Sequence, residues 1–192
     1  INGEQIQQQQ QNIFQKNDNP KAFFFGQIVG GVNFDNSNGL FCEMVIEIGP
    51  KWKLKNCLQQ PQIIQQNLIE SIQTQTAYAD QNNLFLWSHP FDFEFETSTV
   101  NGWPKAIFKV WNVDYHNKID IVSYGIMNFP NHQGFHKIKI NTWSPLGNWQ
   151  YGNQQIFLGN QARLSNLDFV KYHEDKDSIL GQSNGQIIVE FD

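Results

Sequence analysis

The stretch from Leu86 to Asp114 constrains the fold more than any other part of this chain of 192 residues. Within it, phenylalanines alternate with acidic residues in the order Phe91, Asp92, Phe93, Glu94, Phe95 and Glu96. A period of two places the rings on one face of a strand and the carboxylates on the other, which is typical of a half-buried β-strand. The stretch therefore predicts a sheet with one face against a core.

A turn and a second strand follow. Asn101-Gly102 is a turn sequence, and Pro104 fixes the exit from the turn. Beyond it both faces carry apolar residues, with Ala106, Phe108 and Val110 on one and Ile107 and Trp111 on the other. This is expected of a strand in the middle of a sandwich. The two strands form either a hairpin or a corner between sheets, and we expect Lys105 and Lys109 to oppose the acidic row across the strands.

Other short apolar segments predict the remaining strands. They are Phe23–Val29, covered on both faces and ended by Gly30-Gly31; Leu40–Ile48, with Leu40, Cys42, Met44, Ile46 and Ile48 toward the core; Ile72–Tyr78; Ile119–Phe129; Phe135–Ile140; and Gln186–Phe191. Residues 56–70 are a loop or a short helix, residues 142–149 an aromatic loop, and weak strands are placed at 155–158 and 169–172. About eight short strands without a long amphipathic helix indicate an all-β fold, an antiparallel β-sandwich.

Composition narrows the class of protein. With 16 Phe and 6 Trp the chain can bury a sizeable core as one domain. The net charge of -5 makes a nucleic-acid partner unexpected. No apolar run reaches the roughly 18 residues that a membrane-spanning helix needs. Two cysteines, Cys42 and Cys57, are too few for a disulfide framework, so reduced thiols in the cytosol are expected.

The first 20 residues differ from the rest and contain an unbroken glutamine run from Gln7 to Gln11. Such a polar stretch cannot bury enough apolar surface to offset its ordering entropy. We expect residues 1–20 to be a disordered tail, or one ordered by a partner through Ile6 and Phe14, followed by a single domain over residues 21–192.

Neither a catalytic nor a metal site is expected. The loop after Trp111 offers Asn112, Asp114 and Asp120 as calcium ligands, but the opposing loop at residues 49–61 has lysines and no acid. The five histidines, His89, His116, His132, His136 and His173, show no metal-ligand spacing with the cysteines. The acidic row could suggest paired-carboxylate catalysis, but a solvated or charged strand face is the simpler interpretation. We therefore expect a protein that is not an enzyme and has no cofactor.

Six segments in order and spacing resemble the B9-domain family, a divergent branch of the C2-like sandwiches. They read FFFGQIVGG, GPKWKL, WSHPFDFEF, NGWPKAIFKVW, SYGIMNFP and NTWSPLGNW. The residues that carry the motifs, expected to be structural, are Gly26, Trp87, His89, Pro90, Gly102, Trp103, Pro104 and Trp111. The resemblance covers Phe23 to Trp149 well and the closing strand loosely. The glutamine-rich tail and the length of the loop from Cys57 to Asn67 depart from the family pattern.

The resemblance implies a C2-like β-sandwich in a non-enzymatic structural subunit of the ciliary transition zone, on the cytoplasmic side of the ciliary base. It implies as partners the sister B9-domain proteins, including the Meckel syndrome type 1 protein, and membrane proteins of the tectonic type. In that family the complex supports cilium assembly and a diffusion barrier.

Two sets of residues are candidates for contacts. Tryptophan is enriched at binding hot spots, which makes Trp52, Trp143 and Trp149 candidate anchors for a partner. Lys51, Trp52, Lys53 and Lys55 are candidates for a weak contact with an anionic membrane surface, the alternative function being a peripheral lipid-binding module. The simpler interpretation of this segment is a strand start with solvated lysines and with Trp52 and Leu54 facing inward.

Overall fold

The computed structural model describes residues 19–34, 38–57, 63–65, 68–145 and 181–192, and of residues 56–57, 63–65 and 68–70 the backbone only. All regular elements in these residues are strands. They are β1 (Lys21–Val32), β2 (Gly39–Glu47), β3 (Trp52–Cys57), β4 (Ile63–Gln65), β5 (Leu68–Gln73), β6 (Leu84–Thr97), β7 (Lys105–Val113), β8 (Ile119–Asn128), β9 (His136–Pro145) and β10 (Gly181–Phe191).

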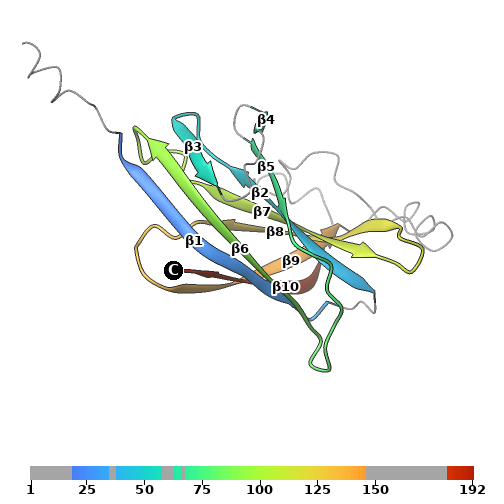
Figure 1. Cartoon of the computed structure of the whole chain (residues 1–192). Coiled ribbons are helices and arrows are strands. Elements are labelled where there is room, and N and C mark those ends of the chain that lie inside the picture. The colour runs from blue at the N-terminus through green and yellow to red at the C-terminus, as the bar shows by residue number, and fades with distance from the viewer. Residues whose placement is uncertain (1–18, 35–37, 58–62, 66–67, 146–180) are drawn as a thin grey trace, which may run out of the picture.

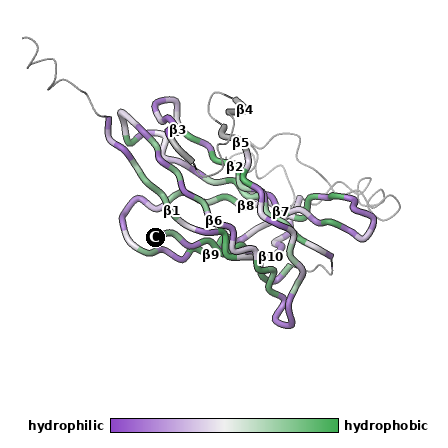
Figure 2. Tube along the Cα trace, viewed as in Figure 1, coloured by the Kyte–Doolittle hydropathy of each residue, from purple (hydrophilic) through white to green (hydrophobic). Residues whose placement is uncertain are grey.

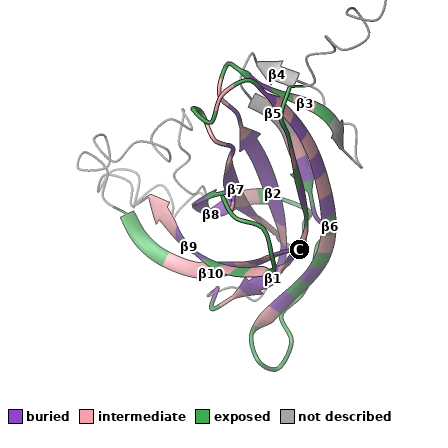
Figure 3. Ribbon diagram, turned by 90° about the vertical axis from the view of Figure 1, so that its left-hand side faces the viewer, coloured by how far each residue is buried: buried purple, intermediate pink, exposed green. Residues whose placement is uncertain are grey.

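The strands form one antiparallel sheet in the order β3-β6-β1-β10-β9-β8-β7-β2-β5-β4 (Figure 1). Strands β8 and β9 pair only at Tyr124 and Trp143, and around this junction the sheet curls over on itself (Figure 3). The result is two packed layers, which we call the β1 layer (β3, β6, β1, β10 and β9) and the β2 layer (β8, β7, β2, β5 and β4). The predicted all-β antiparallel fold is confirmed, with ten described strands instead of about eight.

The main core lies between the two layers. Hydrophobic and hydrophilic residues alternate along the strands (Figure 2), and strand β6 buries Phe91, Phe93 and Phe95 as its sequence period predicts. From the other layer β2 contributes the predicted face of Leu40, Cys42, Met44, Ile46 and Ile48. Trp87 joins the layers, because its indole Nε1 in β6 donates a hydrogen bond to the carbonyl oxygen of Leu40 in β2, 3.0 Å away.

Strands β6 and β7 do not form a hairpin; they belong to different layers, so the corner is the correct alternative. Strand β6 pairs with β1 and β3, and β7 pairs with β2 and β8. The crossing at Asn101-Gly102 packs directly on the crossing between β2 and β3, where the Gly49 amide donates to the Gly102 carbonyl oxygen at 3.0 Å. Gly102 has a φ of 80°, and a Cβ on Gly49 would lie 2.6 Å from the Gly102 Cα. Two glycines are therefore required where the crossings meet.

The prediction that β1 is covered on both faces is wrong. Phe24 and Ile28 are buried, but Phe23 and Phe25 point outward and are exposed. Gly30-Gly31 lies inside β1 and does not end it. A Cβ on Gly31 would lie 2.7 Å from the Phe34 ring and 2.9 Å from the Trp87 ring. The glycine therefore leaves space for two large core side chains.

Three other boundaries differ from expectation. Residues 56–70 contain the end of β3, all of β4 and the start of β5, in place of a loop or helix. Strand β9 continues through the predicted aromatic loop as far as Pro145, because β10 starts at Gly181 and pairs with it there. Strand β5 ends at Gln73, although Leu40 and Ala77 still exchange backbone hydrogen bonds. The weak strands at 155–158 and 169–172 and the tail at residues 1–18 lie outside the described residues.

Candidate interaction surface

The lysine segment forms the outer edge of the β1 layer. Its three lysines, Lys51, Lys53 and Lys55, are exposed. The apolar residues between them, Trp52 and Leu54, pack inward against the core. Trp52 is only 3% exposed, and its indole Nε1 donates to the Asn101 carbonyl oxygen at 3.0 Å. The side chain of Trp52 is therefore part of the core and is not on the surface, where either a partner anchor or a membrane contact would have to be.

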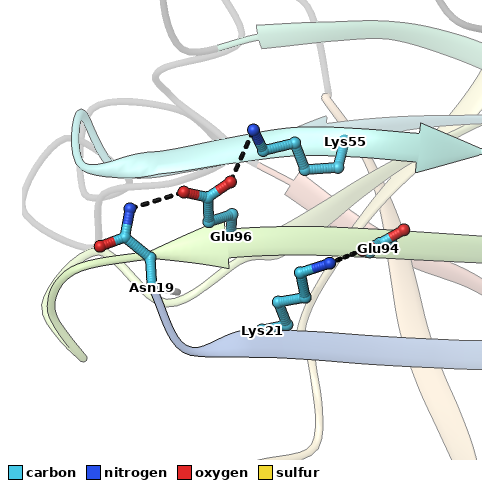
Figure 4. Close-up of polar contacts among 5 residues, drawn as sticks. All are labelled: Asn19, Lys21, Lys55, Glu94 and Glu96. Carbon is cyan, nitrogen blue, oxygen red and sulfur yellow. Dashed lines mark hydrogen bonds and ion pairs between the residues drawn. The ribbon is translucent and has the colours of Figure 1, made fainter. Parts of the chain in front are cut away.

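The carboxylates of β6 lie between strands β3 and β1 on the outer face of this layer (Figure 4). Glu96 accepts hydrogen bonds from Lys55 Nζ at 2.6 Å and from Asn19 Nδ2 at 2.5 Å. Glu94 pairs with Lys21 Nζ at 2.8 Å. The bonds from Lys55 and Asn19 hold the pKa of the Glu96 carboxyl below its usual range. An ionised carboxylate that already accepts from a lysine is not placed to act as a general acid.

The expected partners of this acidic row, Lys105 and Lys109, are in the other layer, so that prediction is wrong. Lys109 Nζ instead pairs with Glu43 Oε1 at 3.0 Å across strands β7 and β2. Glu43 is buried, and its second oxygen accepts from Trp111 Nε1 at 2.8 Å. The period of two had fixed the face of each side chain but not which strand would lie beside it.

The outer face of the β2 layer carries a second apolar cluster that the sequence did not reveal. Its buried members are Val45, Ile107, Ile121 and Tyr124, with Trp111, Ile126 and Trp143 packed against them. Trp143, a candidate anchor, is half-buried here with its ring 5.9 Å from that of Tyr124. Trp149 lies outside the described residues. The available signal was the apolar character of both faces of β7, which had been interpreted only as the mark of a strand in the middle of a sandwich.

The motif at residues 87–90 forms a β-bulge in β6. His89 pairs with Ile28 and Leu86 with Gly30, so that Trp87 and Ser88 together face one residue of β1. Ser88 has a φ of 44°, which is unusual for a residue with a side chain. His89 is half-buried, and burial lowers the pKa of its imidazole. Pro90 is exposed at the outer face.

The other motif residues support the packing of the layers. Trp103 donates from Nε1 to the Phe129 carbonyl oxygen at 3.0 Å, and its ring meets that of Trp52 edge to face at 5.1 Å. Pro104 is buried beside it. In β1, a Cβ on Gly26 would lie 2.3 Å from the Glu190 carbonyl oxygen, so only glycine allows this approach of β10.

The candidate calcium loop is occupied by internal hydrogen bonds. Asp114 Oδ1 accepts from the backbone amides of His116 and Lys118, both at 2.8 Å, and Asp120 pairs with Lys118 Nζ at 2.9 Å. Within the residues that the structure describes, no group of three or more His, Cys, Asp or Glu side chains is arranged to hold a metal ion. Cys42 is a free, buried thiol whose pKa is raised by burial.

No helix among the described residues is long and apolar enough to cross a membrane.

The sequence analysis did not predict that three phenylalanines on or beside the β1 layer are exposed: Phe23, Phe25 and Phe135. The first two follow from the alternation within β1, since the residues on either side of buried Phe24 must face outward.

Comparison with known proteins places the chain in context. The family described as "Ciliary basal body-associated, B9 protein" matches residues 22–192. B9 domain-containing protein 2 of Homo sapiens is 30% identical over 165 residues, covering 86% of this chain and 87% of the relative. The protein of the same name from Danio rerio is 30% identical over 151 residues, covering 79% of each. The motifs at residues 87–90 and 142–149 point to the same branch of the family.

More distant similarities involve a sister protein and a solved structure. B9 domain-containing protein 1 of Homo sapiens is 21% identical over 164 residues, covering 85% of this chain and 76% of the relative. A C2 domain of plant extended synaptotagmin 1 aligns with a TM-score of 0.42 and 12% identity, covering 88% of this chain and 91% of that domain.

Proposed function

Because this chain belongs to the B9-domain family of ciliary basal body-associated proteins, we propose that it is a structural subunit of a protein complex at the ciliary base. Its role is to bind sister B9-domain sandwiches, among them B9 domain-containing protein 1 and the Meckel syndrome type 1 protein. It thereby supports cilium assembly and the diffusion barrier, on the cytoplasmic side of the transition zone and in association with tectonic-type membrane proteins.

The observation that carries the proposal is the family match over residues 22–192, which includes all ten described strands apart from Lys21, the first residue of β1. The sister protein is similar over most of the same length, so the partners are expected to be sandwiches of the same kind. The carboxylates of Glu94 and Glu96 are engaged in ion pairs within the sheet, which favours a scaffold over a catalyst at this acidic row. The family is described by its ciliary association and not by a reaction.

Coexpression with each sister chain, followed by light scattering of the purified products, tests the proposal. We expect a stable stoichiometric complex whose contact buries roughly 800 Å² or more per partner. Trp143 is the candidate anchor that the described surface still offers, so Trp143→Ala should weaken the complex. Tyr115→Ala, at an exposed loop on the β7–β8 turn, is the matched control. A monodisperse monomer that ignores both sister proteins would contradict the proposal.

A lipid-binding module acting through Lys51–Lys55 is the alternative. The exposure of all three lysines favours it, but Glu96 is paired with Lys55 and lies opposite Lys53 in the sheet. That carboxylate reduces the attraction to an anionic leaflet, to which each lysine contributes on the order of 1 kcal/mol. Flotation of the purified protein with anionic vesicles, at low and high salt, separates the two functions.

A further inference from the structure

An Asn-Gly pair lies in the turn that carries the chain from β6 into β7. Both residues, Asn101 and Gly102, are exposed. Asparagine followed by glycine readily loses its side-chain amide without an enzyme, because the next backbone nitrogen can attack the side-chain carbonyl carbon. Glycine presents that nitrogen without a Cβ beside it, so no side chain on the attacking residue blocks the approach. The turn is therefore a candidate site of chemical modification.

The reacting groups of Asn101 and Gly102 are free of hydrogen bonds to described residues. Asn101 makes its contacts through the main chain. Its backbone amide donates to Thr99 Oγ1 at 3.3 Å, and its carbonyl oxygen accepts from Trp52 Nε1 at 3.0 Å. Among the described residues, none bonds to the side-chain amide of Asn101 or to the backbone amide of Gly102. The attacking nitrogen and the carbon that it attacks can therefore react without first breaking a hydrogen bond to the described fold.

Two other Asn-Gly pairs among the described residues are better protected. Gly39 is buried inside β2, and Asn38 before it is half-buried and has interactions of its own. Asn184 is also half-buried. Its Nδ2 donates to the Val122 carbonyl oxygen at 3.4 Å, and its backbone carbonyl oxygen accepts from Thr142 Oγ1. Of these three pairs, the one between β6 and β7 is the pair that folding leaves open to reaction.

We propose that Asn101 deamidates spontaneously to isoaspartate in the folded protein, and that the product is a substrate for a methyltransferase that modifies isoaspartyl residues with S-adenosylmethionine. In the first step, the Gly102 nitrogen forms a bond to the side-chain carbonyl carbon of Asn101 and gives up its proton to water. The side-chain nitrogen takes up a proton and leaves as ammonia, which closes a succinimide ring. Water then opens the ring at either carbonyl and yields aspartate or isoaspartate, without any oxidation or reduction.

Isoaspartate changes the main chain at a crossing that has little room. The backbone then runs through the former side chain, so it gains one methylene before Gly102, and the oxygen that accepted from Trp52 becomes part of a free carboxylate. Beyond it, the Gly102 carbonyl oxygen accepts from the Gly49 amide at 3.0 Å, and a Cβ on Gly49 would lie 2.6 Å from the Gly102 Cα. The longer backbone must shift at least one of these contacts, so the modification should loosen the corner between the layers.

Methylation of isoaspartate tests the inference on the full chain. The purified folded protein is incubated at mildly alkaline pH and then treated with isoaspartyl methyltransferase and S-adenosylmethionine labelled on its methyl group. We expect label to accumulate with the time of incubation in the peptide that contains residue 101. Fragmentation of the peptides in a mass spectrometer should place the deamidation at Asn101, while Asn38 and Asn184 stay intact. In urea, where the fold no longer protects them, all three asparagines should react.

Asn101→Gln is the matched control, because glutamine keeps an amide at the same exposed position but would have to close a larger ring. This variant should lose the label in the peptide that contains residue 101. A thermal melt checks its fold, which should be unchanged because the side-chain amide of Asn101 has no described partner to lose. Equal labelling of that peptide in Asn101→Gln, or deamidation of folded Asn38 or Asn184 ahead of Asn101, would overturn the proposal.

The stability of the aged protein tests the effect on the corner. Asn101→Asp gives the other product of ring opening, without the added methylene. These measurements need no partner, so their outcome is independent of whether the complex with sister domains forms. Chain enriched in isoaspartate by incubation should unfold at a lower urea concentration than Asn101→Asp, whose main chain is unchanged. Equal denaturation midpoints would overturn the inference that the modification loosens the corner.

Discussion

The outer faces of the two layers differ in what their side chains contact. On the β1 layer, charged residues pair across neighbouring strands near the surface, as Lys55 does with Glu96, and the phenylalanines of β1 remain exposed. On the β2 layer, Val45 and Ile107 are buried, and Glu43 is buried in an ion pair with the half-buried Lys109. The comparison indicates that Val45 and Ile107, on the outside of the β2 layer, belong to the stable part of the fold, with half-buried Trp143 at their border, whereas the outside of the β1 layer exposes apolar side chains.

The largest expected effect lies in the core that both layers share. Phe93 is buried between neighbouring rings of Phe91 and Phe95, and Phe93→Ala should lower the free energy of unfolding by about 3–5 kcal/mol. Chemical denaturation measures this loss. The losses measured for variants on the two outer faces can then be compared with it. An unchanged denaturation midpoint would contradict the inward register of β6.

The next prediction compares one apolar residue from each outer face. Ile107 is 0% exposed, so Ile107→Ala should cost about 2–5 kcal/mol, as in a core. Phe25→Thr, on the outer face of β1, should cost about 1 kcal/mol or less. The same denaturation experiment serves for both variants. Equal losses in the free energy of unfolding would contradict the view that the outer face of the β2 layer is packed like a core and that of the β1 layer is not.

A smaller effect is expected when the part-buried ion pair between Glu43 and Lys109 is broken. Glu43→Ala leaves the ammonium of Lys109 and the indole N–H of Trp111 without their acceptor, which should cost about 2–3 kcal/mol. Replacing both Glu43 and Lys109 by methionine should restore much of this loss, because no lysine charge then remains without its carboxylate partner. If the double variant is less stable than Glu43→Ala, the ion pair itself stabilises the folded state, beyond merely keeping Lys109 from being left without a partner.

The smallest effect is the pH dependence contributed by the β1 layer. Hydrogen bonds from Lys55 and Lys137 hold the pKa values of Glu96 and Glu190 below the ordinary value of 4.5. As the pH falls below that value, the unfolded chain takes up protons first, so the free energy of unfolding should decrease until the folded carboxyls titrate as well.

Urea denaturation at a series of pH values measures this slope, and a variant carrying Lys55→Gln and Lys137→Gln should show a flatter one. Lys105→Gln, in the β2 layer, is the control. If Lys105→Gln flattens the slope as much as the double variant does, the pH dependence does not come from the ion pairs of the β1 layer.

The sequence predicted those features of the fold that depend on local alternation. The inward rings of β6 and the core face of β2 follow from a period of two, which neighbouring residues determine on their own. The partners of the acidic row did not follow, because strand β3 and strand β1 reach β6 from distant parts of the chain. The bulge at Ser88 depends on the pairing of β6 with the distant strand β1, and the approach of Gly49 to Gly102 depends on the contact of two crossings; no local pattern records either.

The candidate surfaces were predicted less well for a similar reason. Trp52 was a candidate contact residue because of its residue type, but the simpler interpretation, in which it faces inward, matches the structure, where its side chain fills the corner beneath Asn101. Phe23 and Phe25 were assigned to a doubly covered strand because the run from Phe23 to Phe25 is continuously apolar. Composition alone does not distinguish a covered sheet face from an exposed aromatic one.

The pairing of β1 with β10 has a consequence for biosynthesis. These strands lie side by side in the middle of the β1 layer, yet they come from opposite ends of the described chain. While the ribosome is still translating, β1 has no β10 beside it, and one of its edges is left unpaired. Closing so long a loop is also slow. A premature stop codon anywhere before residue 181 would thus remove a central strand and leave one edge of β1 unpaired.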